Sequence, residues 1–93
     1  MIIGFLSLDI FFPYCRSLKE KRKRLLSFRD RLKKKYNVAF AELEYHDKWQ
    51  RTKIGIVTLN NEKKMVEKIF YKVIQDFEDN VEGELLKTEI QFC

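Results

Sequence analysis

The spacing of apolar residues in this 93-residue chain switches between two periods, and the order of the switches limits the fold more than any other feature. Apolar residues alternate with a period of two in residues 2–12, 38–45, 52–59 and 85–92, a pattern typical of strands. They repeat every 3.6 residues in residues 17–36 and again between residues 61 and 83, a pattern typical of amphipathic helices. The sequence therefore predicts six elements in the order strand, helix, strand, strand, helix, strand.

Residues at the ends of these segments agree with the predicted boundaries. Pro13 ends the first strand, and Ser17 with Glu20 three residues later forms a capping box that begins the first helix. A short polar loop joins the second and third strands, which therefore form a hairpin. We expect Asn60 or Asn61 to cap the second helix.

The two periods also predict which side chains form the core. One face of the first strand and one stripe of each helix are apolar, and these faces are expected to pack together. The predicted core residues are Leu6, Leu8, Ile10, Phe12, Leu18, Leu25, Phe28, Leu32, Tyr36, Val66, Ile69, Phe70, Val73 and Phe77.

The element order is that of the ferredoxin-like α+β fold, which a chain of this length builds as a single domain over residues 1–93. Right-handed crossovers then give a four-stranded antiparallel sheet with strand order 4-1-3-2 and both helices on one face. The other face has no cover within the chain. Because several strands carry apolar residues on both sides, we expect this face to bind a partner or a second copy of the chain.

Positive charge is concentrated in the first helix. Residues 16–35 hold eleven of the nineteen Lys and Arg residues against only Glu20 and Asp30, a net charge of +9, while the rest of the chain sums to −4. Such a helix indicates an anionic partner. The alternatives are a merely solvated face, an acidic protein and a membrane surface, although a helix packed on a sheet is poorly placed to enter lipid. The cations predicted to contact phosphate, because they point away from the apolar stripe, are Lys19, Lys23, Arg24, Arg31, Lys33 and Lys34.

The predicted topology brings the start of this helix to the same edge as the loop between the second and third strands. Trp49 in that loop is a candidate for stacking on a base, with Arg51 and His46 beside it; the alternative is that Trp49 caps the core. Residues 52–57 lack the rings of an RNA recognition motif, so contact by shape or charge is expected. The predicted nucleic-acid or anion-binding residues are Arg16, Lys19, Lys23, Arg24, Arg31, Lys34, His46, Lys48, Trp49 and Arg51.

No set of residues amounts to an active site, so we expect no enzyme activity, no cofactor and no metal. His46 and Asp47 are neighbours on a chain with no second histidine, which argues against a metal site. Glu42 and Glu44 are expected to share a strand face and pair with cations of the first helix. Cys15 and Cys93 fall far apart in the topology and are expected to be reduced thiols.

An acidic stretch lies at the end of the second predicted helix and in the turn after it. Asp76, Glu78, Asp79, Glu82 and Glu84 have no Lys or Arg among them. One interpretation is a solvated loop; the other is pairing with the basic helix of a neighbouring copy, which would give a homodimer.

Several short motifs carry a resemblance to a known family. The runs Ser17-Leu18-Lys19-Glu20-Lys21-Arg22, Ala41-Glu42, Tyr45 and Trp49-Gln50-Arg51-Thr52-Lys53, leading into Ile54-Gly55-Ile56, resemble the YlxP-like bacterial family. That family is a domain of unknown function with a ferredoxin-like fold. Its gene often lies beside translation initiation and ribosome-maturation genes, which implies a ribosome-associated role. The resemblance brings no assigned catalytic residues.

Together these observations predict a non-enzymatic module that binds RNA or a ribosomal particle through the first helix and the adjoining hairpin loop. The alternative is a homodimeric interaction module that associates through the uncovered sheet face and docks an acidic protein. The apolar start of the chain lacks a basic region and a cleavage site, and Asp9 and Pro13 make it too short for a membrane span. We therefore expect a cytoplasmic protein.

Overall fold

The computed structural model describes all 93 residues and contains the six predicted elements in the predicted order. Their bounds are β1 Ile2–Phe11, α1 Leu18–Lys35, β2 Ala39–Glu44, β3 Arg51–Asn60, α2 Lys63–Asn80 and β4 Glu84–Phe92.

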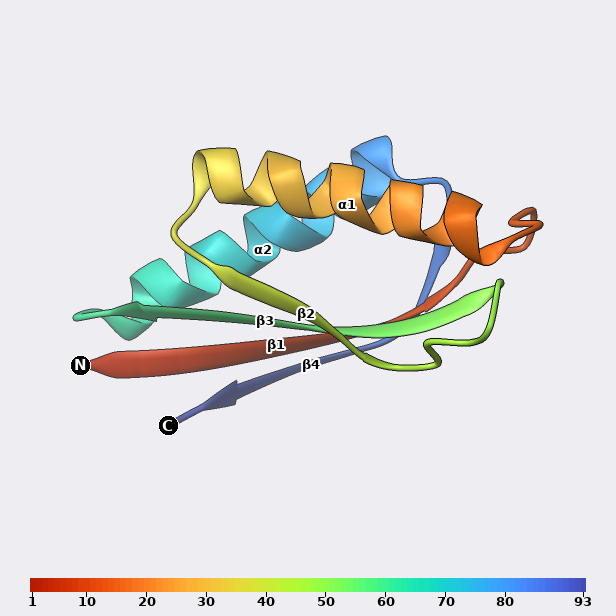
Figure 1. Cartoon of the computed structure of the whole chain (residues 1–93). Helices are drawn as coiled ribbons and strands as arrows, with labels where there is room; N and C mark the ends of the chain where they lie inside the picture. Colours follow the sequence, from red (N-terminus) through yellow and green to blue (C-terminus); the bar gives the residue numbers. More distant parts are fainter.

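The four strands form one sheet in the order β2-β3-β1-β4, and every neighbouring pair is antiparallel. Read from the other edge, this is the predicted order 4-1-3-2. Both helices lie on the same face of the sheet, as Figure 1 shows. The predicted α+β ferredoxin-like arrangement is therefore confirmed. Neither helix is apolar enough along its length to cross a membrane.

The core lies between the sheet and the helices, and the alternation in β1 decides which side chains enter it. Leu6, Leu8 and Ile10 are fully buried beneath the helices, whereas Phe5 and Phe11 point to the uncovered face and stay half-buried. Of the predicted core residues, only Leu18, Tyr36 and Ile69 are half-buried rather than buried, and the others are all in the core.

The helix caps agree with the sequence in one case and differ in the other. The Ser17 hydroxyl accepts a hydrogen bond from the Glu20 N–H at 3.0 Å, as predicted. The Glu20 carboxylate accepts from the Arg16 N–H at 3.1 Å, and this hydrogen bond holds the pKa of Glu20 below its ordinary value. The predicted asparagine cap of α2 is wrong: Glu62 occupies that position without a side-chain cap, and Asn60 accepts from the Glu62 N–H before the helix begins.

A β-bulge in β2 changes the expected orientation of its two glutamates. Glu42 lies opposite Ile54, but Glu44 lies opposite Lys53, so the register shifts between them. Ile54 is buried under the helices and Lys53 is on the other face. The prediction that Glu42 and Glu44 share a face is therefore wrong: Glu42 points toward α1, and Glu44 forms an ion pair with Lys53 at 3.3 Å on the uncovered face.

Candidate nucleic-acid interface

The start of α1 and the β2–β3 loop lie at one end of the molecule, as the topology predicts. The Gln50 side chain donates to the backbone oxygens of Pro13 and Cys15 at 3.2 and 3.4 Å. The Phe12 N–H donates to the Gln50 oxygen at 2.8 Å. Figure 1 shows this end on the right, where α1 begins above the loop. The two segments that carry the predicted interface are thus joined by hydrogen bonds.

A buried lysine, which was not among the predicted site residues, holds this end together. Lys21 is completely buried although it lies in the basic run of α1. Its Nζ is 3.0 Å from a carboxylate oxygen of Glu42. It also donates to the backbone oxygens of Tyr45, Arg51 and His46 at 2.7, 3.2 and 3.5 Å. One side chain of α1 therefore binds both ends of the hairpin loop.

Tyr45, at the start of this loop, has a backbone conformation that side-chain-bearing residues rarely adopt. Its φ is +68°, and it is the only non-glycine residue of the chain with a positive φ. The Tyr45 oxygen accepts from Lys21 and from the Lys48 N–H at 3.0 Å, which keeps the turn in this shape. A strained backbone conformation of this kind persists only where several surrounding contacts hold it in place, and these hydrogen bonds hold the loop.

Beside the loop lies an open hollow of about 420 Å³, lined by Phe11, Tyr45, Lys48, Trp49, Gln50 and Arg51. Trp49 is 53% exposed, so the alternative in which it caps the core is wrong. Phe11 and Arg51 are paired at the end of β1 and β3 and point to the face that the helices do not cover. The hollow is thus at the corner between the loop and the uncovered face.

Arg51 is held in a fixed position within this hollow. Its guanidinium lies 4.6 Å from the centre of the Tyr45 ring and donates two hydrogen bonds to the Asp9 carboxylate at 2.8 and 2.9 Å. These hydrogen bonds lower the pKa of Asp9 below its ordinary value and raise the pKa of Arg51. Of the other predicted loop residues, His46 and Lys48 are exposed, and the His46 Nε2 lies 3.2 Å from the Glu42 backbone oxygen.

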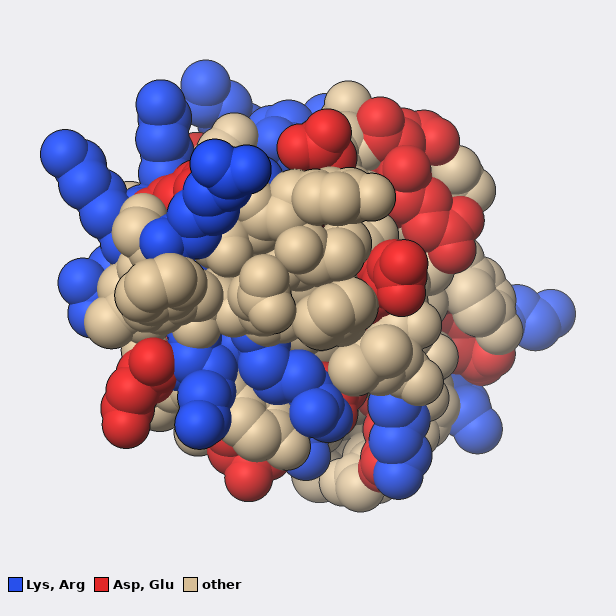
Figure 2. Space-filling view, turned by 90° about the vertical axis from the view of Figure 1, so that its right-hand side faces the viewer, with Lys and Arg blue, Asp and Glu red and all other residues tan.

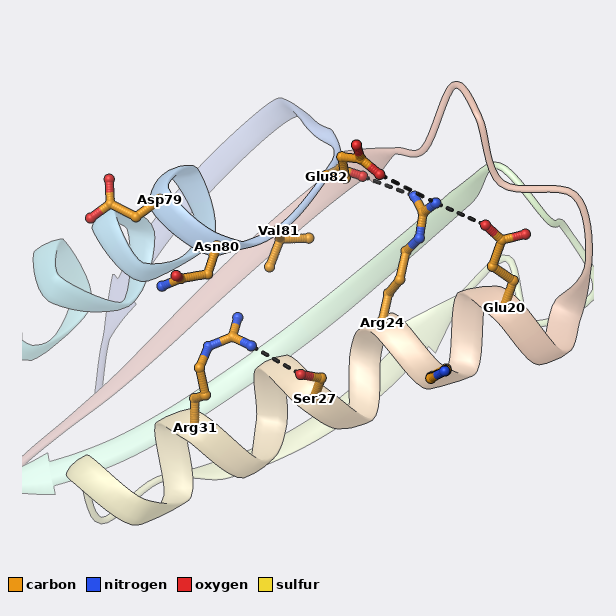
Figure 3. A pocket seen from close by; sticks show the side chains of 9 residues that line it. Glu20, Arg24, Ser27, Arg31, Asp79, Asn80, Val81 and Glu82 are labelled. Atoms are coloured by element: carbon orange, nitrogen blue, oxygen red, sulfur yellow. Dashed lines mark hydrogen bonds and ion pairs between the residues drawn. The ribbon is translucent and has the colours of Figure 1, made fainter.

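The cations of α1 divide into two groups, and those that face α2 are neutralised. Arg24 pairs with Glu20 at 2.9 Å and with Glu82 at 3.7 Å, contacts drawn in Figure 3. Arg31 pairs with Asp76 at 3.0 Å. Arg24 and Arg31, which were predicted to contact phosphate, are therefore not free cations, because each is half-buried and paired with a carboxylate.

These contacts also correct the interpretation of the acidic stretch. Asp76 is buried within α2 rather than in a solvated loop, and it pairs with both Arg31 and Lys35 of α1. Glu82, which follows α2, pairs with Arg24 of α1. The basic helix that these acids contact belongs to the same chain. Between them lies a groove of about 590 Å³ whose lining mixes both signs of charge (Figure 3).

The second group of cations has no carboxylate within ion-pairing distance. Its members are exposed, and at 100° per residue the helical ones lie on the outer and β2-facing sides of α1, with Lys23 at the rim of the groove toward α2. They are Arg16, Lys19, Arg22, Lys23, Lys33 and Lys34, of which Arg22 was missing from the predicted site. Figure 2 looks onto the loop end: Lys and Arg lie along the left and lower sides, and Asp and Glu gather at the upper right.

This arrangement can bind an anion and stack a planar ring. No group of three or more His, Cys, Asp or Glu side chains is placed to hold a metal ion. Cys15 is buried and Cys93 exposed, and both are free thiols.

Comparison with known proteins agrees with the fold and with the family resemblance. A protein of Bacillus subtilis (strain 168), described as uncharacterized protein YlxP, is 33% identical over 90 residues, covering 95% of this chain and 98% of the other. The de novo designed protein Ferredog-Diesel superposes with a TM-score of 0.53 at 14% identity, covering 96% of this chain and 83% of the other. The designed protein Foldit4 gives 0.52 at 13% identity, covering 100% and 97%. These two likenesses show the fold alone. The family described as "Protein of unknown function (DUF503)" matches residues 3–90, and this chain belongs to that family.

Proposed function

We propose that this protein is a non-enzymatic RNA-binding module that contacts phosphate groups through the free cations of α1 and acts in association with a ribosomal particle. The observation that carries the proposal is the division of charge on α1. Five basic residues of α1 are matched by carboxylates, whereas its other five basic residues and Arg16, just before the helix, are not.

The unmatched cations have a cost that the fold does not require. Lys19 and Lys23 are four residues apart on one helix, and like charges at that spacing destabilise a helix by about 0.2–0.5 kcal/mol. Neither side chain forms an ion pair within the chain. Phosphate groups would neutralise these charges and release bound counterions, which is the main source of affinity in electrostatic RNA binding.

The test is the binding of fluorescently labelled single-stranded RNA, followed by anisotropy over a range of salt concentrations. The variant reverses Lys19, Lys23 and Lys34 to Glu. We expect its affinity at low salt to fall at least about tenfold and its salt slope to fall by about 2, since each phosphate contact on a single strand contributes about 0.7 to the slope.

A matched control reverses three exposed lysines of α2, Lys64, Lys68 and Lys72, to Glu. This variant has the same net charge as the first, so it separates a defined surface from general attraction. Equal loss of affinity in both variants contradicts the proposal, as does an absence of binding at low salt. Equal binding of a polyglutamate peptide would favour an acidic protein as the partner. Cosedimentation with ribosomal subunits in cell extract tests the association with a ribosomal particle.

A second candidate function, self-association, is favoured by the uncovered face of the sheet. Phe5, Leu43, Val57 and Leu59 lie on this face, and Leu59 is 57% exposed. A sheet of four strands and ten residues measures about 19 by 33 Å, or roughly 600 Å² before side-chain relief is counted. That approaches the roughly 800 Å² that each partner buries in a stable interface.

The charges on this face favour a second copy over a partner of strong charge. The ionic side chains form three pairs within the chain: Asp9 with Arg51, Glu44 with Lys53, and Lys87 with Glu89. Glu84, which lies opposite Phe11 at the end of the same face, has no ion pair and leaves the face with a net charge of only −1, whereas the chain has a net charge of +5. Light scattering across concentrations tests the dimer, with the exposed Leu59→Lys change as the disrupting variant. A protein that stays monomeric throughout contradicts this candidate.

A further inference from the structure

We infer that the hollow beside Trp49 binds one unpaired base of a single-stranded RNA, with the base stacked on the indole ring. The inference rests on the proposed function, and it adds a site and a substrate class to it. The cations of α1 would contact phosphates of any nucleic acid, whereas this hollow would select strands whose bases are free.

Aromatic surface is exposed around the hollow. Trp49 is 53% exposed and makes no hydrogen bond, and the rings of Phe11 and Tyr45 line the same space. Exposed tryptophan surface contributes nothing to the core. Stacking of a base on such a ring is a common source of affinity for single strands, and every base offers a face to stack.

Two positively charged side chains lie beside these rings. Lys48 lines the hollow and has no carboxylate within ion-pairing distance, so it is free to contact the phosphate next to a stacked base. Arg51 presents a flat guanidinium on the Tyr45 ring and is fixed there by Asp9. A ring bordered by one free and one fixed cation matches a nucleotide better than an apolar ligand.

The hollow is already formed without a ligand. Lys21 binds three loop carbonyls from inside the molecule, and Gln50 binds the segment before α1. A loop that is already ordered loses little conformational entropy on binding. The Gln50 amide hydrogens that face this region are occupied by Pro13 and Cys15, so base edges are not read by them. We therefore expect stacking with little sequence preference.

The experiment uses the fact that Trp49 is the only tryptophan of the chain. Its intrinsic fluorescence reports on the hollow, while anisotropy of a labelled strand reports on total binding. The ligands are a single-stranded RNA of mixed sequence and a blunt RNA duplex of the same length. We expect quenching of Trp49 by the single strand and none by the duplex at equal occupancy.

Variants separate this site from the helix surface. Trp49→Ala is expected to weaken single-strand binding about 5- to 150-fold, the range for loss of one stacked base, and to leave duplex binding unchanged. Trp49→Phe, which keeps a ring, is expected to recover part of the loss. The control is Tyr71→Ala, which removes an exposed ring on α2 and should have no effect. Because Trp49 and Tyr71 are both largely exposed, the variants are expected to fold, and circular dichroism checks this.

The outcomes distinguish the two proposals. If RNA binds with the predicted salt dependence but Trp49→Ala keeps full affinity and the fluorescence does not change, the hollow is not a base site and the proposed function stands. Quenching by the duplex equal to that by the single strand also overturns the inference. If no RNA binds at low salt, both proposals fail.

Discussion

Replacing Lys21 with methionine tests whether a buried amine fixes the hairpin loop to α1. Methionine is apolar and of similar length, so it fills the space but donates no hydrogen bond. The Arg51 oxygen loses a donor at 3.2 Å, and an unsatisfied buried acceptor costs about 1–3 kcal/mol. The Tyr45 oxygen loses a donor at 2.7 Å but keeps the Lys48 N–H at 3.0 Å. Glu42 loses its cation but keeps the Thr52 hydroxyl at 2.6 Å, and its side chain is 18% exposed.

Partial solvation of Glu42 places the expected loss near the lower end of the range for breaking a buried ion pair. We expect the free energy of unfolding to fall by about 3 kcal/mol. A chain of this length has a total stability of roughly 5–14 kcal/mol, so the loss is a large fraction of it. It corresponds to a fall in Tm of roughly 12–24 °C.

The assay is urea denaturation followed by far-ultraviolet circular dichroism. The matched control is Lys19→Met, an exposed lysine of the same helix without an ion pair, for which we expect a change within about 0.5 kcal/mol. Combining Lys21→Met with Glu42→Met should cost less than the sum of the single changes, because the double variant leaves no unpaired charge. A Lys21→Met protein as stable as the Lys19→Met protein would refute the reasoning.

Three further predictions concern stability. Hydrogen bonds from Arg51 lower the pKa of Asp9, so the pair stabilises the fold above about pH 4, and this contribution is lost as the pH falls through the lowered pKa. Asp9→Asn should therefore lower Tm at pH 7 but not near pH 2. An equal decrease in Tm at both pH values contradicts this prediction. Ser17→Ala should cost about 1 kcal/mol in urea denaturation and Ser17→Gly much less, unless the cap is dispensable. Gly4→Ala would place a methyl group against Val66, and we expect a loss of about 1–3 kcal/mol by thermal unfolding, with unchanged Tm as the opposing result.

The fold could be predicted because burial on one face leaves a periodic trace in the sequence. Leu6, Leu8 and Ile10 alternate with residues of the other face, of which Phe5 and Asp9 are half-buried and Ser7 is buried, and the core stripe of α2 repeats at the helical period. The turn and cap residues then marked the boundaries of the elements. The bulge in β2 was not predictable in this way, because one extra residue between Glu42 and Glu44 breaks the alternation that a strand pattern assumes.

The candidate site was predicted in outline, and the errors came from tertiary contacts. Arg24 and Arg31 were expected to contact phosphate, yet Asp76, the partner of Arg31, and Glu82, which pairs with Arg24 in addition to the local Glu20, lie more than forty residues away. No local pattern reveals such a contact. Lys21 is different: it lies four residues before Leu25 and eleven before Leu32, on the apolar stripe of the helix. Its position in that stripe was the signal that it is buried.

The residues after the loop show why Trp49 needs an explanation of its own. Gln50 binds the backbone before α1, Arg51 binds Asp9, and Thr52 binds Glu42. These three side chains, together with Lys21, account for the shape of the loop. Trp49 makes no such contact and remains exposed at the edge of the hollow that the loop creates. The hydrogen bonds that shape the loop do not involve the indole ring, and the proposed base site gives that exposed ring a role that these bonds do not.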